Sequence, residues 1–198
     1  MKLNIVYLTQ NSNDIKLKNR MNIFSFGEYI DGKPYKVLDE RKMRASAGIM
    51  FLFGLFASIN GIILSRYVFI PYIMGGFVLN FMVGLFINPK YSPTVLLASI
   101  FVWRQSPLSI GAVQKKFAWS LGLALSGTIF VLSLFLQSDS SYFEPVCMLC
   151  IICLILLYLE TAFGICLGCR LYQLAVAIKL LPKPKVRPNC MGDSCTTV

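Results

Sequence analysis

The chain has 198 residues, 56% of them hydrophobic, and a formal net charge of +10 at pH 7. This composition excludes an ordinary soluble domain and predicts an all-α integral membrane protein. The sequence contains no histidine, which excludes His-ligated haem, His-based metal sites and histidine as a general base. Basic residues flank hydrophobic segments without a nucleic-acid-binding motif, so we expect a lipid bilayer as partner and no nucleic acid.

The first 44 residues are polar and hold nine of the nineteen Lys and Arg residues. Residues 1–20 lack an apolar core of signal-peptide length, so we expect no cleaved leader. Two short runs around the turn dipeptide Asp31-Gly32 predict a β-hairpin over residues 24–38. Residues 1–44 are therefore expected to form a small cytoplasmic cap.

A transmembrane domain is expected over residues 45–169, because four of its segments are apolar and long enough to cross a bilayer. These predicted spans are residues 45–65, 67–88, 117–136 and 146–169. Residues 94–103 are apolar but too few to cross, which predicts an interfacial or re-entrant helix. In the C-terminal region, residues 170–198, apolar residues at helical spacing predict an amphipathic helix lying on the membrane.

The Lys and Arg residues are distributed unevenly among the regions outside the spans. In chain order, the five regions contain nine, one, four, none and five of them. Because cytoplasmic loops are enriched in Lys and Arg, this alternation predicts four crossings with both termini in the cytoplasm.

Five of the seven cysteines lie in the fourth predicted span. Cys147, Cys150 and Cys153 open it, and Cys166 and Cys169 close it. On one helix the 19 residues from Cys147 to Cys166 would span roughly 28 Å, close to the hydrocarbon thickness of a bilayer. The spacing therefore predicts a thiol pair at each face of the membrane, whereas the deeper Cys153 is expected to serve packing.

The expected outer pair is Cys147 and Cys150. Two thiols at i and i+3 of a helix start can form a reducible disulfide, and the helix N-terminus favours a thiolate. Such a pair at the mouth of a four-helix bundle resembles the quinone-reducing, disulfide-forming proteins of the DsbB and vitamin K epoxide reductase types. Alternatively the two cysteines serve only packing, as small apolar residues.

The expected inner pair, Cys166 and Cys169, follows an ionisable residue, Glu160, inside the same span. Charge inside a membrane usually has a role, so Glu160 is a candidate proton acceptor beside a dithiol that exchanges disulfides or accepts persulfides. The alternative is a tightly packed corner of small residues. A helix C-terminus disfavours a thiolate, so Arg170 would have to compensate.

Glu160 also needs a partner of its own. An ionised carboxylate would pair with Lys116 or Arg170. A protonated one would bond to a polar side chain of another span, and the candidates are Asn60, Asn80 and Ser126. Near it, Gly164 and Gly168 form a G-x-x-x-G motif that lets another helix approach closely.

Other candidates flank the spans. The charged cluster at residues 39–44, which includes Glu40, Arg41 and Arg44, predicts an ion-pair network that anchors the protein. Its basic members and Arg170 are expected to meet anionic headgroups. Cys190 and Cys195, on a basic proline-rich tail, would shuttle electrons or sulfur to the inner pair, bind Cu(I) or Zn, or stay idle. No resident metal site is assigned.

Three stretches resemble an uncharacterised bacterial membrane family, catalogued as domain of unknown function 4395. They are VLDERKMRASA at residues 37–47, the run Lys116-Phe117-Ala118, and Glu160-x-x-x-Gly164-x-Cys166-x-Gly168-Cys169-Arg170-Leu-Tyr172. The resemblance covers roughly residues 26–175. It implies four membrane helices in a bacterial inner membrane, a Cys-x-x-Cys at the cytoplasmic end, and association with thioredoxin-like or sulfurtransferase proteins, without an established activity.

The leading hypothesis is membrane thiol–disulfide or persulfide exchange with Cys166 and Cys169 as the working pair. Thiol exchange needs sulfur atoms in contact, so a quinone or a second protein would have to link the two ends of the fourth span. The alternatives are a non-catalytic subunit of a larger membrane complex and a carrier of Cu(I) or Zn.

Overall fold

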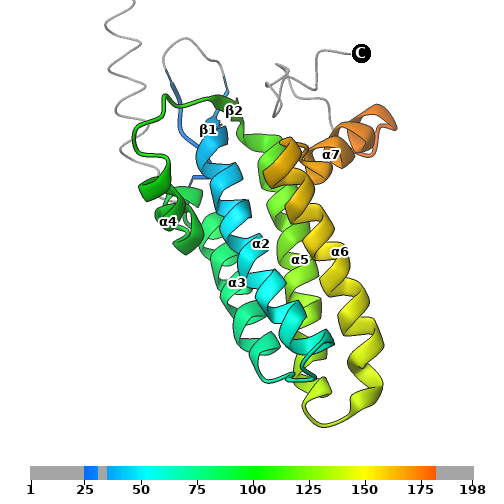
Figure 1. Ribbon diagram of the computed structural model, residues 1–198. Helices are drawn as coiled ribbons and strands as arrows, with labels where there is room; N and C mark the ends of the chain where they lie inside the picture. Colours follow the sequence, from blue (N-terminus) through cyan, green and yellow to red (C-terminus); the bar gives the residue numbers. More distant parts are fainter. Residues whose placement is uncertain (1–24, 31–34, 182–198) are drawn as a thin grey trace, which may run out of the picture.

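The computed structural model describes residues 25–30 and 35–181 and is mostly helical (Figure 1). Four long helices form a bundle in which neighbours along the chain run in opposite directions. They are α2 (Glu40–Ile62), α3 (Phe69–Phe86), α5 (Ala112–Leu136) and α6 (Phe143–Phe163). Each is long and apolar enough to cross a membrane, α6 together with the 3₁₀ turn η2 (Ser140–Tyr142) before it. The prediction of four such helices is confirmed.

One end of the bundle, which we call the sheet end, carries a two-stranded antiparallel sheet. Strand β1 (Val37–Asp39) pairs with β2 (Ser109–Gly111), so that Val37 lies opposite Gly111. An antiparallel bridge also joins Glu28 to Val37, as the predicted hairpin requires, although its turn residues 31–34 lie outside the described part. The pairing of β1 with β2 was not predicted, because it joins residues about 70 positions apart.

The helix α2 starts directly after this sheet. The Asp39 carboxylate accepts a hydrogen bond from the Arg41 amide at 3.2 Å, which satisfies one of the unpaired N–H groups of a first turn. Glu40 in the first turn adds favourable negative charge at the positive end of the helix dipole. The polar segment before the first span therefore also supplies the N-cap of α2.

The expected short helix between the second and third spans is α4 (Pro93–Phe101), which follows the 3₁₀ turn η1 (Pro89–Tyr91). A buried polar cluster holds it against α2 and α3. The Asn80 side-chain oxygen accepts from the Thr94 amide at 3.0 Å, from the Thr94 hydroxyl at 2.8 Å and from the Ser92 hydroxyl. Thr94 also bonds to Ser46 of α2 at 2.6 Å. Asn80, a predicted partner of Glu160, has this structural role instead.

The fourth helix is shorter than the predicted span 146–169, because α6 ends at Phe163. Gly164 has a left-handed backbone, φ +66°, which glycine adopts without steric cost and which commonly ends helices. A separate helix, α7 (Leu167–Ala177), then leaves the bundle at a steep angle (Figure 1). Gly164 and Gly168 therefore do not share a helix face, and the prediction that they form a G-x-x-x-G packing motif on one helix is wrong.

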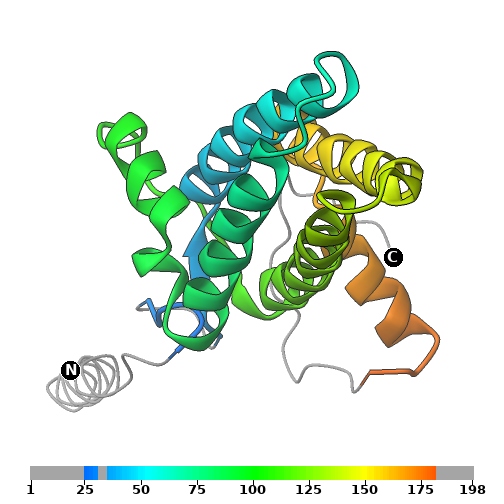
Figure 2. The same ribbon diagram turned by 90° about the horizontal axis from the view of Figure 1, so that it is seen from below.

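Seen from below the bundle, α4 and α7 lie on opposite sides of it (Figure 2). α7 packs against α5, where a Cβ on Gly168 would lie only 2.6 Å from the Ala118 Cβ. The Tyr172 ring lies 5.7 Å from that of Phe117. Leu174, by contrast, is exposed. α7 is thus tightly docked at the sheet end with apolar residues facing outward.

Candidate functional site

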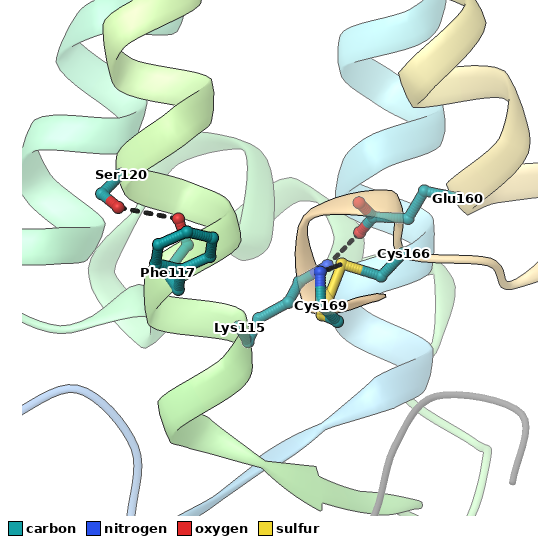
Figure 3. Close-up of a disulfide and its surroundings, with 6 residues drawn as sticks. All are labelled: Lys115, Phe117, Ser120, Glu160, Cys166 and Cys169. Atoms are coloured by element: carbon teal, nitrogen blue, oxygen red, sulfur yellow. Dashed lines mark hydrogen bonds and ion pairs between the residues drawn. A yellow bond between two sulfur atoms is a disulfide. The ribbon is translucent and has the colours of Figure 1, made fainter. Parts of the chain in front are cut away.

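A disulfide bond joins Cys166 to Cys169, whose Cα atoms are 5.2 Å apart (Figure 3). Cys166 is the N-cap of α7, and its sulfur accepts a hydrogen bond from the Cys169 amide at 3.3 Å. The expectation that the pair sits at a helix C-terminus is therefore wrong. At a helix N-terminus the dipole and the free N–H groups favour negative charge on Cys166, so Arg170, which is exposed, need not compensate.

Glu160 of α6 forms an ion pair with Lys115 of α5 beside the disulfide (Figure 3). The Lys115 side chain is 1% exposed, whereas Lys116, a predicted partner, points outward. Lys115 shares its helix face with the buried Trp119, four residues on. This spacing is the signal that could have identified Lys115, because residues i and i+4 lie on the same face of a helix.

The pair is costly to form, because Lys115 is buried and Glu160 is only 18% exposed, so both charges lose most of their contact with water. A charge held among apolar helices usually has a role or a partner. Figure 3 shows the Lys115 ammonium and the two sulfur atoms converging on one place at the sheet end. In this position a carboxylate can accept and return a proton of the dithiol, and an ammonium can stabilise negative charge beside it.

A cavity of about 420 Å³ extends from this place into the bundle. All four long helices and α7 contribute to its walls, and Glu160 and Cys166 line it together. The remaining walls are largely apolar, with side chains such as Met50, Phe77 and Trp119. The disulfide therefore borders an apolar chamber whose polar groups are gathered at one end.

Arg44 holds the corner between α6 and α7. Its guanidinium donates to the Thr161 carbonyl at 3.1 Å and to the Ala162 carbonyl at 3.4 Å, and so satisfies acceptors that a helix end leaves free. It also pairs with Glu40 at 3.9 Å. A Cβ on Gly164 would lie 3.2 Å from the Arg44 guanidinium carbon, so the turn and the arginine fit each other closely. The sequence predicted Arg44 in a membrane-anchoring ion-pair network with Glu40 but did not predict its contacts with the end of α6.

A family model described as "Domain of unknown function (DUF4395)" matches residues 38–177. The chain belongs to this family. The match runs from β1 to the last residue of α7, and so covers Arg44, Lys115, Glu160 and the disulfide. The predicted resemblance to this family is confirmed. No curated protein and no solved structure matches the chain.

The other cysteines are not brought to this site. Cys147, Cys150 and Cys153 of α6 are unpaired thiols, so the predicted outer pair is not bridged in this structure. Cys147 lies at the start of α6, at the opposite end of the helix from the disulfide. Within residues 25–30 and 35–181, no three His, Cys, Asp or Glu side chains gather where they could hold a metal ion. Cys190 and Cys195 lie outside the described residues, and their predicted shuttle role stays a prediction.

Proposed function

We propose that this DUF4395 protein carries out thiol–disulfide exchange at a membrane through Cys166 and Cys169. The observation that carries the proposal is a disulfide at the N-terminus of α7 beside the buried Lys115–Glu160 pair. Disulfides at such helix starts exchange readily, because the leaving or attacking thiolate is stabilised by the helix.

Because Cys166 is the N-cap, we assign its sulfur as the thiolate that attacks a partner's disulfide and that leaves when the Cys166–Cys169 bond is reduced. Oxidation of the dithiol breaks its two S–H bonds, forms the Cys166–Cys169 bond and passes two electrons and two protons to an acceptor, which is a partner's disulfide or a quinone. Glu160 accepts a proton during this step, and Lys115 holds the resulting charge in place. Persulfide transfer is the second chemistry of the same pair, with Cys166 as the acceptor of the outer sulfur atom.

The membrane arrangement follows from the distribution of charge. We propose that α2, α3, α5 and α6 cross a bacterial inner membrane, with both termini and the sheet end on the cytoplasmic side. Arg41, Arg44 and Arg170 would then lie near anionic headgroups. A thioredoxin-like or sulfurtransferase protein in the cytoplasm is the proposed partner for the disulfide.

Differential alkylation in acid-quenched membranes, read by mass spectrometry, tests the proposal. We expect a fraction of Cys166 and Cys169 to be labelled only after reduction. This oxidised fraction should follow the redox state of the cell. Cys153, in the middle of α6, is the internal control and should be labelled without reductant once the protein is denatured. If Cys166→Ser and Cys169→Ser leave cellular thiol redox state and sulfur metabolism unchanged, the proposal fails.

A second candidate is a non-catalytic subunit of a larger membrane complex. It is favoured by Gly76 of α3 and Gly127 of α5, where no atom of the described residues would lie within 4 Å of an added Cβ. Small residues on open helix faces allow another membrane helix to approach closely. Co-purification of a large partner with a variant lacking every cysteine, and with undiminished activity, would favour this function over thiol exchange.

A further inference from the structure

We propose that the cavity beside the disulfide binds the head of an isoprenoid quinone, which oxidises the Cys166–Cys169 dithiol. This inference rests on the proposed thiol exchange and names its oxidant. It starts from the accessibility of the two sulfur atoms. Cys166 is 5% and Cys169 7% exposed, and α7 lies too close to Ala118 to leave space on that side.

Thiol exchange with a protein requires two sulfur atoms within bonding distance. In this structure α7 covers the pair, so a folded partner does not reach it without movement of that helix. The cavity, however, extends to Cys166. A small molecule inside the cavity therefore has direct access to the sulfur.

The cavity opens between α5, α6 and α7. Leu121, Ile152 and Leu171 line it and are nevertheless 41%, 45% and 45% exposed, so they form its rim. All three belong to apolar faces of these helices. A ligand would therefore enter from an apolar phase, which for helices of this length and composition is the lipid bilayer.

The chemistry of the walls selects among redox carriers. The chamber is lined by Met43, Met50, Phe77, Phe81 and Trp119, with Glu160 and Cys166 at one end. Flavin and nicotinamide nucleotides would bring phosphate charges into apolar walls, which is strongly unfavourable. A quinone has an uncharged, flat head with two carbonyl oxygens and an apolar tail, and it is dissolved in the lipid.

The reaction balances without another reagent. The two S–H bonds of Cys166 and Cys169 break, the S–S bond forms, and the electron pair passes to the quinone ring. The two protons go to the quinone oxygens, one of them through Glu160, and quinol leaves. The Lys115 ammonium stabilises negative charge on the oxygen nearest the sulfur.

Fluorescence of Trp119 tests binding directly, because the chain has two tryptophans and the other, Trp103, is 83% exposed. In a Trp103→Phe background, short-chain ubiquinone added to protein in lipid nanodiscs should quench Trp119 with saturation. Cys153→Phe, which places a ring in the cavity, should raise the half-saturating quinone concentration at least about tenfold, since overpacked sites accept ligands poorly. Cys147→Phe, the same change two turns away on α6, should leave it unchanged.

A second experiment measures the redox reaction between the dithiol and the quinone. Reduced protein in the same nanodiscs should convert one equivalent of ubiquinone to quinol, and Cys166→Ser or Cys169→Ser should abolish this. Should Cys153→Phe fail to fold, Leu125→Phe fills the same cavity. Quenching that does not saturate and is equal in Cys153→Phe and Cys147→Phe overturns the quinone site, even where Cys166 and Cys169 exchange with a protein. Saturable quenching without any redox change of Cys166 and Cys169 overturns the quinone as the oxidant, whereas an unchanged cellular thiol redox state in Cys166→Ser and Cys169→Ser overturns the proposed function instead.

Discussion

Lys115 and Glu160, 45 positions apart in the chain, meet as an ion pair at the point where the cavity reaches the disulfide. The pair joins α5 to α6 and so fixes the distance between the two helices that flank the cysteines. It therefore combines a structural and a chemical role, and substitutions can separate the two.

Replacing Lys115 with Met leaves Glu160 without its partner in a largely apolar place. We expect the free energy of unfolding to fall by about 3 kcal/mol, because breaking a buried ion pair leaves an uncompensated charge. The double variant Lys115→Met with Glu160→Leu should recover much of this loss while thiol oxidation stays slow. Unfolding in mixed micelles measures the first effect, and Lys116→Met is the exposed control. Equal losses for Lys115→Met and Lys116→Met would contradict the pairing.

Gly168 is the position at which α7 approaches α5. An added methyl group would overlap the Ala118 Cα, 2.8 Å away, and backbone cannot move aside as a side chain can. We expect Gly168→Ala to lift α7 and to speed reduction of Cys166–Cys169 by a small water-soluble phosphine about tenfold, the equivalent of roughly 1.4 kcal/mol. Gly127→Ala, where space is open, is the control. An unchanged reduction rate in Gly168→Ala would show that α7 does not cover the disulfide.

Gly84 and Gly76 offer a matched pair on α3. A Cβ on Gly84 would overlap the Trp119 ring, which is itself held between Phe26 and Phe81 at centroid distances of 5.8 and 5.5 Å. Overpacking of this kind costs about 1–3 kcal/mol, so Gly84→Ala should lower the thermal midpoint. Gly76→Ala should raise it slightly, because alanine is favoured over glycine in helices by about 0.5–1 kcal/mol. Thermal unfolding followed by circular dichroism distinguishes the two, and the reverse order would count against this packing.

Asn80 holds α4 on the bundle. Asn80→Ala removes the acceptor shared by Ser92 and Thr94 and leaves their buried donors without it, at a cost of about 1–3 kcal/mol. We expect amide hydrogen exchange in α4 to accelerate while exchange in α6 stays slow. Ser99→Ala, which removes an exposed hydroxyl bonded only within α4, is the control. Uniform acceleration over all helices would instead indicate global destabilisation.

How much of the site was predictable differs from residue to residue. Cys166, Cys169 and Glu160 stood out because thiols and a carboxylate are unusual within apolar segments. Gly164 was assigned to helix packing, although glycine just before a new N-cap also signals a helix end. Arg44 and Lys115 were missed as members of the site, because their partners lie on helices distant in the sequence and no local pattern identifies them.

The four long apolar helices and the short α4 segment were predictable because hydropathy and helix length depend only on neighbouring residues. The family was predictable because its motifs are local stretches of sequence. Tertiary structure alone decided that Cys166 begins a helix and does not end one, that Glu160 meets Lys115, and that both border a cavity. The physical reason is that these features depend on contacts between segments far apart in the chain. The left-handed turn at Gly164 and the capping by Arg44 redirect α7, and only then do the dipole, the ion pair and the disulfide converge.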